Sequence, residues 1–222
     1  MFKKVLVAED IDSINIGLGQ VLNELGITEI HHTKYCDDAF LKIKKANIDN
    51  APFDLLISDL SFKTDHREVT ILSGEKLIEV IKKENPSIKI IAYSIDDRPF
   101  TIKNLFKNLN IDAFIHKGRK SIDQLKTAIS AIAANDNTYI SPELSYVLLD
   151  KTIYEIDSYD IQLLKQLSQG VPQDKMDICF QELGITPNSK STIEKRISKL
   201  KDYFKAHNTV HLVAIAKDLG IT

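Results

Sequence analysis

The chain has 222 residues, of which 43% are hydrophobic and 27% are charged, and its formal net charge is -2. This length fits one or two domains that each bury a core, and the near-neutral charge excludes a uniformly basic nucleic-acid coat. Two distant cysteines, Cys36 and Cys179, form no metal or disulfide motif. Because no segment approaches the ~20 apolar residues of a membrane span, we expect a cytoplasmic protein with no membrane partner.

The first part of the chain alternates short apolar runs with amphipathic stretches five times. We expect strands at Lys4–Ala8, 29–34, 54–58, Lys89–Ser94 and Ala113–His116, and helices near 13–25, 38–45, 74–83, 100–109 and 122–134. This alternation is typical of βαβ units around a parallel sheet. The pattern predicts an α/β domain with a flavodoxin-like, doubly wound (βα)5 fold.

The second part of the chain carries only helical patterns. Ser141-Pro142 is a helix start signal inside an otherwise mixed segment. Four further helical patterns follow, near 158–169, 172–183, 191–204 and 209–219. The predicted domains are therefore an α/β domain at 1–134, a linker with a short helix at 135–155, and a small all-α domain at 156–222.

Three carboxylates follow two strands of the predicted sheet. Glu9 and Asp10 end the first strand, and Asp59 ends the third. In a doubly wound sheet these strand ends lie together at the carboxyl edge, where ligands bind. Like charges at such distances repel unless a cation neutralises them, and a hard divalent ion such as Mg²⁺ prefers carboxylate ligands. The sequence predicts a metal site there.

Two further strand ends add a hydroxyl and an ammonium to this edge. The fourth strand ends on Ser94, and Lys117 follows the fifth strand. Three acids, a hydroxyl and a lysine are the groups that covalent phosphorylation of an aspartate requires. Asp59 would attack a phosphoryl group while Lys117 pairs with the phosphoryl oxygens.

With these residues in place, the first 134 residues resemble a bacterial response-regulator receiver domain. The motifs are Val7-Ala8-Glu9-Asp10, Ile57-Ser58-Asp59, Tyr93-Ser94 and Phe114-Ile115-His116-Lys117-Gly118, in the family's order. The resemblance implies that Asp59 accepts phosphate from a sensor histidine kinase, and that Ser94 and Phe114 act as switch residues. It also implies a third metal ligand, the backbone carbonyl of Ser61.

One segment departs from that family. Phe62-Lys63 stands where receiver domains carry a Met-Pro or similar pair, and the expected glycine, Gly74, comes late. Residues 63–73 therefore contain an insertion beside the pocket. The insertion is either a polar surface loop or a contact for a phosphoryl donor or partner.

The helical pattern at 191–204 has an apolar face and a face richer in basic residues. By itself such a helix is equally a solvated amphipathic helix. The segment, together with Gln169–Met176, resembles the LuxR-type helix-turn-helix of NarL/FixJ response regulators. The last helical pattern of the chain, near 209–219, is similar to the last helix of that family, which commonly supplies the dimer contact.

The resemblance implies binding to double-stranded DNA, with the second helix of the motif in the major groove. Glu194, Lys195 and Ser198 are expected at base edges, and Lys190, Ser191, Thr192, Lys199 and Arg196 at or near phosphates. A second departure is a lengthened turn at 183–190, which would either contact the DNA backbone or tilt the second helix enough to impair DNA binding.

The sequence favours a response regulator that dimerises on activation and binds DNA. Its first rival is a phosphorylation-independent regulator whose C-terminal domain binds a protein partner. An enzyme, such as an aspartate-nucleophile phosphohydrolase, is disfavoured because Ser61 stands where a second Asp would serve as acid and base. We therefore expect no enzymatic activity.

Overall fold

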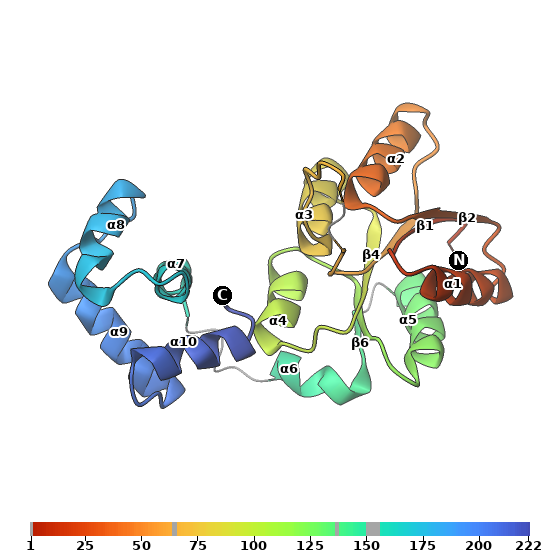
Figure 1. The fold of residues 1–222 in the computed structure, drawn as a ribbon. Helices are drawn as coiled ribbons and strands as arrows, with labels where there is room; N and C mark the ends of the chain where they lie inside the picture. Colours follow the sequence, from red (N-terminus) through yellow and green to blue (C-terminus); the bar gives the residue numbers. More distant parts are fainter. Residues whose placement is uncertain (1, 64–65, 136–137, 150–155) are drawn as a thin grey trace. The chain divides into compact units, whose positions relative to one another are not determined.

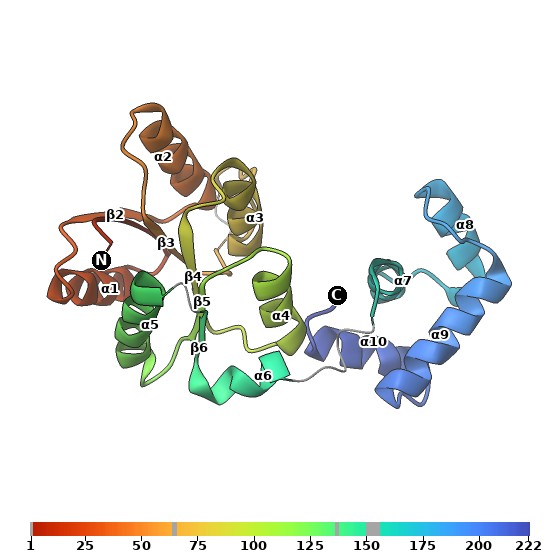
Figure 2. The same cartoon turned by 180° about the vertical axis from the view of Figure 1, so that it is seen from behind.

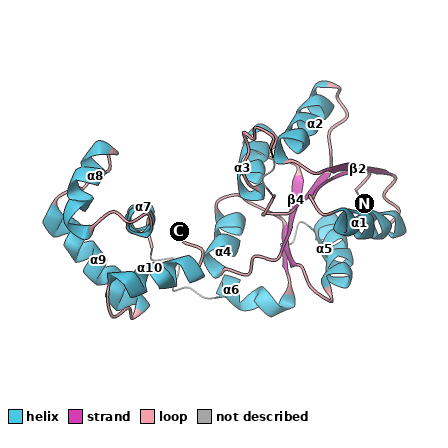
Figure 3. Ribbon diagram, viewed as in Figure 1, coloured by secondary structure: helices cyan, strands magenta, loops and turns pink. Residues whose placement is uncertain are grey.

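The protein was analysed as a computed structural model, which describes residues 2–63, 66–135, 138–149 and 156–222. Its residues group into two compact units, Met1–Asp97 with Ile102–Val147, and Arg98–Thr101 with Leu148–Thr222. Figure 3 shows that, among the described residues, strands occur only in the first unit, whereas the second is helical. The first lies mainly within the predicted domain 1–134 and the second mainly within 156–222, and the predicted boundaries themselves stay predictions.

The first unit is built on one parallel sheet. Its strands are β1 (Lys4–Ala8), β2 (Glu29–Thr33), β3 (Leu55–Ser58), β4 (Lys89–Ser94), β5 (Ala113–His116) and β6 (Tyr139–Ile140). The strand order is β2-β1-β3-β4-β5-β6, and every neighbouring pair is parallel (Figure 2). The strands in the middle of the sheet are continuous apolar runs because both faces of the sheet are buried.

Helices cover both faces of this sheet. They are α1 (Asp12–Glu24), α2 (Cys36–Ile48), α3 (Gly74–Glu84), α4 (Pro99–Lys107) and α5 (Ser121–Asn135). Alternate strand residues point to opposite faces. Leu6 and Leu56 pack in one core with α2, α3 and α4, whereas Val5 and Leu55 pack in the other with α1 and α5 (Figure 1). The doubly wound fold predicted from the sequence is confirmed.

Strand β6 was not predicted, because the sequence analysis placed residues 139–140 in a linker. Tyr139 and Ile140 pair with Ala113 and Phe114 of β5. A 3₁₀ turn (Pro142–Leu144) and helix α6 (Ser145–Leu149) follow, and Leu144 and Val147 are buried in the core of the first unit. A two-residue strand is too short to give a periodic sequence signal. The rest of the predicted linker, residues 136–137 and 150–155, lies outside the described residues.

The second unit contains α7 (Ser158–Ser168), a 3₁₀ turn (Gln173–Lys175), α8 (Met176–Glu182), α9 (Lys190–Phe204) and α10 (Thr209–Asp218). Its core is formed by apolar residues of these helices, including Leu163, Phe180, Ile197 and Leu212. Residues 183–189 connect α8 to α9, and this connection is longer than the three or four residues usual in a helix-turn-helix. The lengthened turn predicted here is therefore present.

The helix starts in this unit are chemically defined. The Asp157 side chain accepts from the N–H of Asp160 in a capping box at α7, and Ser189 accepts from Thr192 N–H at α9.

Among the described helices, none is long and apolar enough to cross a lipid bilayer.

Candidate functional site

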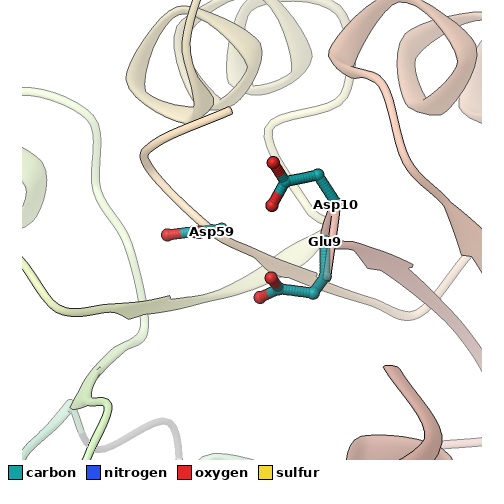
Figure 4. A group of neighbouring side chains, drawn as sticks. All are labelled: Glu9, Asp10 and Asp59. Atoms are coloured by element: carbon teal, nitrogen blue, oxygen red, sulfur yellow. The ribbon is translucent and has the colours of Figure 1, made fainter. Parts of the chain in front are cut away.

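The three predicted carboxylates meet at the carboxyl edge of the sheet. Strands β1 and β3 are neighbours in the register Ala8 to Ser58, and the Asp59 N–H donates to the Ala8 carbonyl oxygen at 2.9 Å. The following residues, Glu9, Asp10 and Asp59, each offer one carboxylate oxygen within 4.8 Å of the others. Figure 4 shows these side chains gathered at the two strand ends. Glu9 is fully buried and Asp59 is 5% exposed.

Lys117 brings the predicted ammonium into contact with two of these acids. Its Nζ atom lies 2.8 Å from Oδ2 of Asp59 and 2.7 Å from Oε2 of Glu9. The lysine follows β5, and its N–H donates to the Ser94 carbonyl oxygen at 2.8 Å, which fixes its backbone beside β4. Strands separated by more than fifty residues in the sequence thus place one cation between two acids.

The pocket nevertheless holds more negative than positive charge. Burial raises the pKa of Glu9, and Lys117 offsets this effect only in part. Burial acts to lower the pKa of Lys117, but its hydrogen bonds to Asp59 and Glu9 outweigh it and hold that pKa above the ordinary value. Lys117 is therefore charged at neutral pH, and a divalent cation would compensate the remaining negative charge.

The donor set fits such a cation. All three side chains offer oxygen atoms, the hard ligands that Mg²⁺ prefers, and together they could hold a metal ion. Asp10 Oδ2 already accepts a hydrogen bond from the Lys63 N–H at 3.0 Å. Ser61 lies two residues beyond Asp59 on an exposed stretch, and its carbonyl as a further ligand stays a prediction.

The two predicted switch residues are both buried. Ser94 ends β4, is fully buried, and its Oγ accepts from the Asp96 N–H at 3.3 Å. Phe114 is also fully buried and belongs to the same core cluster as Leu144 and Val147. Ser94 lies at the same edge of the sheet as Lys117, whereas Phe114 lies inside β5. The switching role of Ser94 and Phe114 stays a prediction.

Gly74 holds the loop after Asp59 against the sheet. A Cβ atom at this position would lie 1.8 Å from the backbone oxygen of Asp59, so only glycine fits without displacement. The Gly74 N–H donates to the Leu60 carbonyl oxygen at 3.0 Å. The late glycine that the sequence analysis matched to the family therefore packs directly on the candidate phosphoryl acceptor.

The inserted segment, of which residues 64–65 are not described, is attached to α2. Arg67 pairs with Asp38 at 3.1 Å and lies over the Tyr35 ring, and the Thr70 N–H donates to Asp37 at 3.1 Å. Ile71 is buried in the core. This part of the insertion is therefore packed against the first unit.

The sequence analysis did not single out Asn15. This buried residue of α1 donates from Nδ2 to the Glu9 carbonyl oxygen at 2.7 Å, and its Oδ1 lies 3.0 Å from Nδ1 of His32. Asn15 thereby fixes the backbone that carries the acidic pair. A polar residue on the otherwise apolar face of α1 is the signal that could have indicated it.

The candidate DNA-contact residues lie mostly on the outside of α9. Ile193, Ile197 and Leu200 are buried. The candidates other than Arg196 are all exposed or half-buried, and they are Lys190, Ser191, Thr192, Glu194, Lys195, Ser198 and Lys199. Solvent-facing side chains of this helix are therefore the ones available to a ligand.

Arg196 differs from the other candidates because it makes an internal ion pair. Its Nε atom lies 2.9 Å from Oδ1 of Asp160, and its Nη2 contacts Asp157. Asp160 is 3% exposed, and burial followed by the nearby Asp157 charge raises its pKa, while Arg196 opposes the shift. Arg196 thus links α9 to α7, and its expected place at or near a DNA phosphate stays a prediction.

No protein-family model matches the chain. A curated relative, the dynein heavy chain-like protein 2 of Plasmodium falciparum isolate 3D7, is 28% identical over 129 residues, or 52% of this chain. The chain spans about 2% of the length of that relative, whose activity is not carried over to it.

Solved structures resemble the whole chain. RcsB of Salmonella typhimurium, described as a response regulator, has a TM-score of 0.67 and 18% identity, with 97% of this chain and 99% of that chain covered. RcsB of Salmonella enterica serovar Typhimurium bound to the promoter rprA with the phosphomimetic BeF3- has a TM-score of 0.65 and 19% identity, with 99% and 100% covered. Its isolated REC domain has a TM-score of 0.53 and 22% identity, with 65% and 97% covered.

At these identities the likeness defines the fold alone. The chain has the fold of a receiver domain followed by a helix-turn-helix domain. Residues that the sequence analysis selected at four strand ends lie together at one edge of the receiver sheet.

Proposed function

We propose that this chain is a two-component response regulator that accepts a phosphoryl group on Asp59 and controls DNA binding by its helical unit. The observation that carries the proposal is the position of Lys117, whose ammonium touches both Asp59 and Glu9 in a pocket with a surplus of carboxylates. This arrangement leaves Asp59 as a nucleophile beside a fixed cation.

The chemistry follows from these contacts. An Asp59 carboxylate oxygen attacks phosphorus, the bond from phosphorus to the donor's histidine nitrogen breaks, and an acyl phosphate forms on Asp59. Lys117 then pairs with a phosphoryl oxygen, and the Ser94 hydroxyl donates to another. Glu9 and Asp10, with Asp59, would hold Mg²⁺, which supplies neutralisation of the phosphoryl charge.

The added group carries about 1.5 to 2 negative charges at neutral pH and draws Lys117 and Ser94 inward. Phosphorylation in this way shifts a pre-existing equilibrium of the receiver. The proposal includes a sensor histidine kinase as the phosphoryl donor and a homodimer as the activated, DNA-binding form. The solved RcsB–DNA structures that share this fold support the DNA-binding half of the proposal.

Phosphorylation is tested with Mg²⁺ and a small phosphodonor such as acetyl phosphate. Intact mass should show a gain of one phosphoryl group on the wild type and none on Asp59→Ala, and size exclusion should show a shift to dimer. Asp12→Ala is the matched control, because Asp12 is exposed and pairs with the surface residue Lys34 at 2.6 Å. A mass gain on Asp59→Ala, or none on the wild type, would refute the phosphoryl mechanism.

The DNA-binding half is tested by the salt dependence of affinity for a random-sequence duplex. Lys195 and Lys199 are exposed on α9, and each phosphate contact contributes about 0.9 to the slope of log affinity against log salt. Lys199→Ala should therefore flatten the slope by about one contact, whereas Lys165→Ala, at an exposed position of α7, should not. Affinity without salt dependence would contradict DNA binding.

A second candidate is a phosphorylation-independent regulator whose helical unit binds a protein. The exposed apolar residues Ile178 and Leu183, at and after α8, favour it, because they are 54% exposed beside the lengthened turn. Absence of a mass gain together with salt-insensitive partner binding would establish this candidate over the first.

A further inference from the structure

The sixth strand and the residues after it lie directly beside the strand that carries Lys117. Tyr139–Val147, here called the coupling segment, comprises β6, the 3₁₀ turn and the first turn of α6. It forms the end of the first unit, and the second unit follows it in the chain from Leu148. Any signal that travels along the chain from the sheet to α7 passes through it.

Backbone hydrogen bonds attach this segment to β5. The Tyr139 N–H donates to the Asp112 carbonyl oxygen, and the Ser141 N–H donates to the Phe114 carbonyl oxygen, each at 3.0 Å. Leu144 and Val147 are buried in the same core cluster as Phe114. The segment therefore follows β5 both through its backbone and through its packing.

The Ser141 hydroxyl makes the contact nearest to the candidate phosphoryl site. Ser141 is fully buried and stands at the N-cap of the 3₁₀ turn, yet its side chain makes no capping bond. Instead Oγ accepts from the N–H of His116, the residue before Lys117, at 2.9 Å. A hydroxyl normally used for local capping is thus used to hold the end of β5.

The same hydroxyl also links to α5. Ser141 Oγ donates to Gln124 Oε1 at 2.5 Å, and Gln124 Nε2 donates to Glu143 Oε2 at 2.9 Å. Ser141 is fully buried and Gln124 is 8% exposed, so the hydrogen bond between them is shielded from water, whereas Glu143 at the outer end of the chain is exposed. A displacement at His116 would therefore change Ser141 and Gln124 together.

We propose that the coupling segment transmits the state of the Asp59 pocket toward the helical unit, with Ser141 as its positioning residue. The proposal rests on the proposed function of Asp59. A new group on Asp59 pulls Lys117, the movement of Lys117 shifts the adjacent His116 N–H, and the Ser141 hydroxyl follows it. The turn and α6 then repack against Phe114.

Hydrogen exchange of the full chain tests this proposal, with Mg²⁺ and beryllofluoride as a phosphoryl mimic. Residues 55–63 report binding at Asp59, and residues 138–149 report the coupling segment. In the wild type the exchange rates of both segments should respond to beryllofluoride. The exchange rates of the Tyr139 and Ser141 amides should change by about threefold to tenfold, which is the factor expected from one hydrogen bond. In Ser141→Ala only residues 55–63 should respond, which also shows that the variant is folded.

Two further variants sharpen the experiment. Ser145→Ala removes a hydroxyl of the same segment that donates to the local Pro142 carbonyl oxygen, so its response should equal that of the wild type. Gln124→Ala should weaken the response at 138–149 by removing the other partner of Ser141. A full response at 138–149 in Ser141→Ala, or a wild type that responds only at 55–63, overturns the coupling while leaving Asp59 phosphorylation intact. A wild type that responds at neither segment overturns both proposals.

Discussion

The Nζ atom of Lys117 lies 2.8 Å from Oδ2 of Asp59, so the residue that would attack a phosphoryl group is already paired with the residue that would bind it afterwards. The same ammonium lies 2.7 Å from Oε2 of Glu9. The Lys117 ammonium thus contacts two buried acids, and Asp10 is the third member of the carboxylate cluster. The single positive charge of Lys117 neutralises the charge of this cluster only in part.

Mg²⁺ should stabilise the folded chain because a ligand that binds only the native state raises the free energy of unfolding. The increase is about 2.7 kcal/mol at a concentration one hundred times the dissociation constant. Asp10→Asn should lose most of this increase, whereas Asp12→Asn should retain it. Thermal unfolding with and without Mg²⁺ measures both, and equal stabilisation of the two variants would contradict a metal site at Asp10.

Gly74→Ala should destabilise the first unit by about 1–3 kcal/mol or more, because its Cβ atom would lie 1.8 Å from the Asp59 backbone oxygen. The displaced backbone should also slow phosphorylation of Asp59. Gly17→Ala is the control. No neighbouring atom lies within 4 Å of its Cβ position in α1, so it should stabilise the helix by about 0.5–1 kcal/mol. Denaturant unfolding distinguishes these opposite signs.

Cys36 should make stability fall with rising pH in the alkaline range. Burial, followed by the charges of Asp37, Asp59 and Asp10, raises the pKa of its thiol from 9.0 to about 12. Between these values the unfolded chain has released a proton that the folded chain keeps, so stability falls by about 1.4 kcal/mol per pH unit from this group.

The free energy of unfolding of Cys36→Ala lacks this contribution. As pH rises, the free energy of unfolding of the wild type should therefore fall relative to that of the variant. A difference between the two that stays constant with pH would show that the thiol has no raised pKa. Denaturant titrations across that range measure the difference.

Arg196→Gln should destabilise the helical unit by about 1–3 kcal/mol, because it leaves the buried Asp160 carboxylate without its cation. The double variant with Asp160→Asn should recover part of this loss in a double-mutant cycle. Lys199→Ala, which removes an exposed charge, should change stability by less than about 0.5 kcal/mol. Additive losses from Arg196→Gln and Asp160→Asn would show that the pair does not couple α9 to α7.

The candidate site could be predicted from the sequence because each of its groups follows a strand. Parallel strands are easily recognised apolar runs, and their carboxyl ends meet at one edge, so the sequence alone indicates Glu9, Asp10, Asp59, Ser94 and Lys117. The late glycine, Gly74, was likewise recognisable from its position after the insertion.

Other features depend on contacts that periodicity does not encode. Tyr139 and Ile140 join the sheet through pairing with β5 rather than through any pattern of their own. Arg196 occupies a basic helix, but its partner Asp160 lies at the start of α7, where the sequence shows only a capping residue. Long-range ion pairs and two-residue strands are decided by tertiary structure.

Phosphorylation of Asp59 is tested most directly by identifying the residue that carries the acyl phosphate. The wild type is treated with Mg²⁺ and acetyl phosphate, reduced with borohydride, which converts an aspartyl phosphate to homoserine, and then digested and sequenced by mass spectrometry. If Asp59 accepts the phosphoryl group, homoserine appears at position 59 while Asp10 is unchanged, and no conversion occurs when Mg²⁺ is chelated. Homoserine at another acidic position, or none anywhere while phosphodonor is present, would contradict phosphorylation of Asp59.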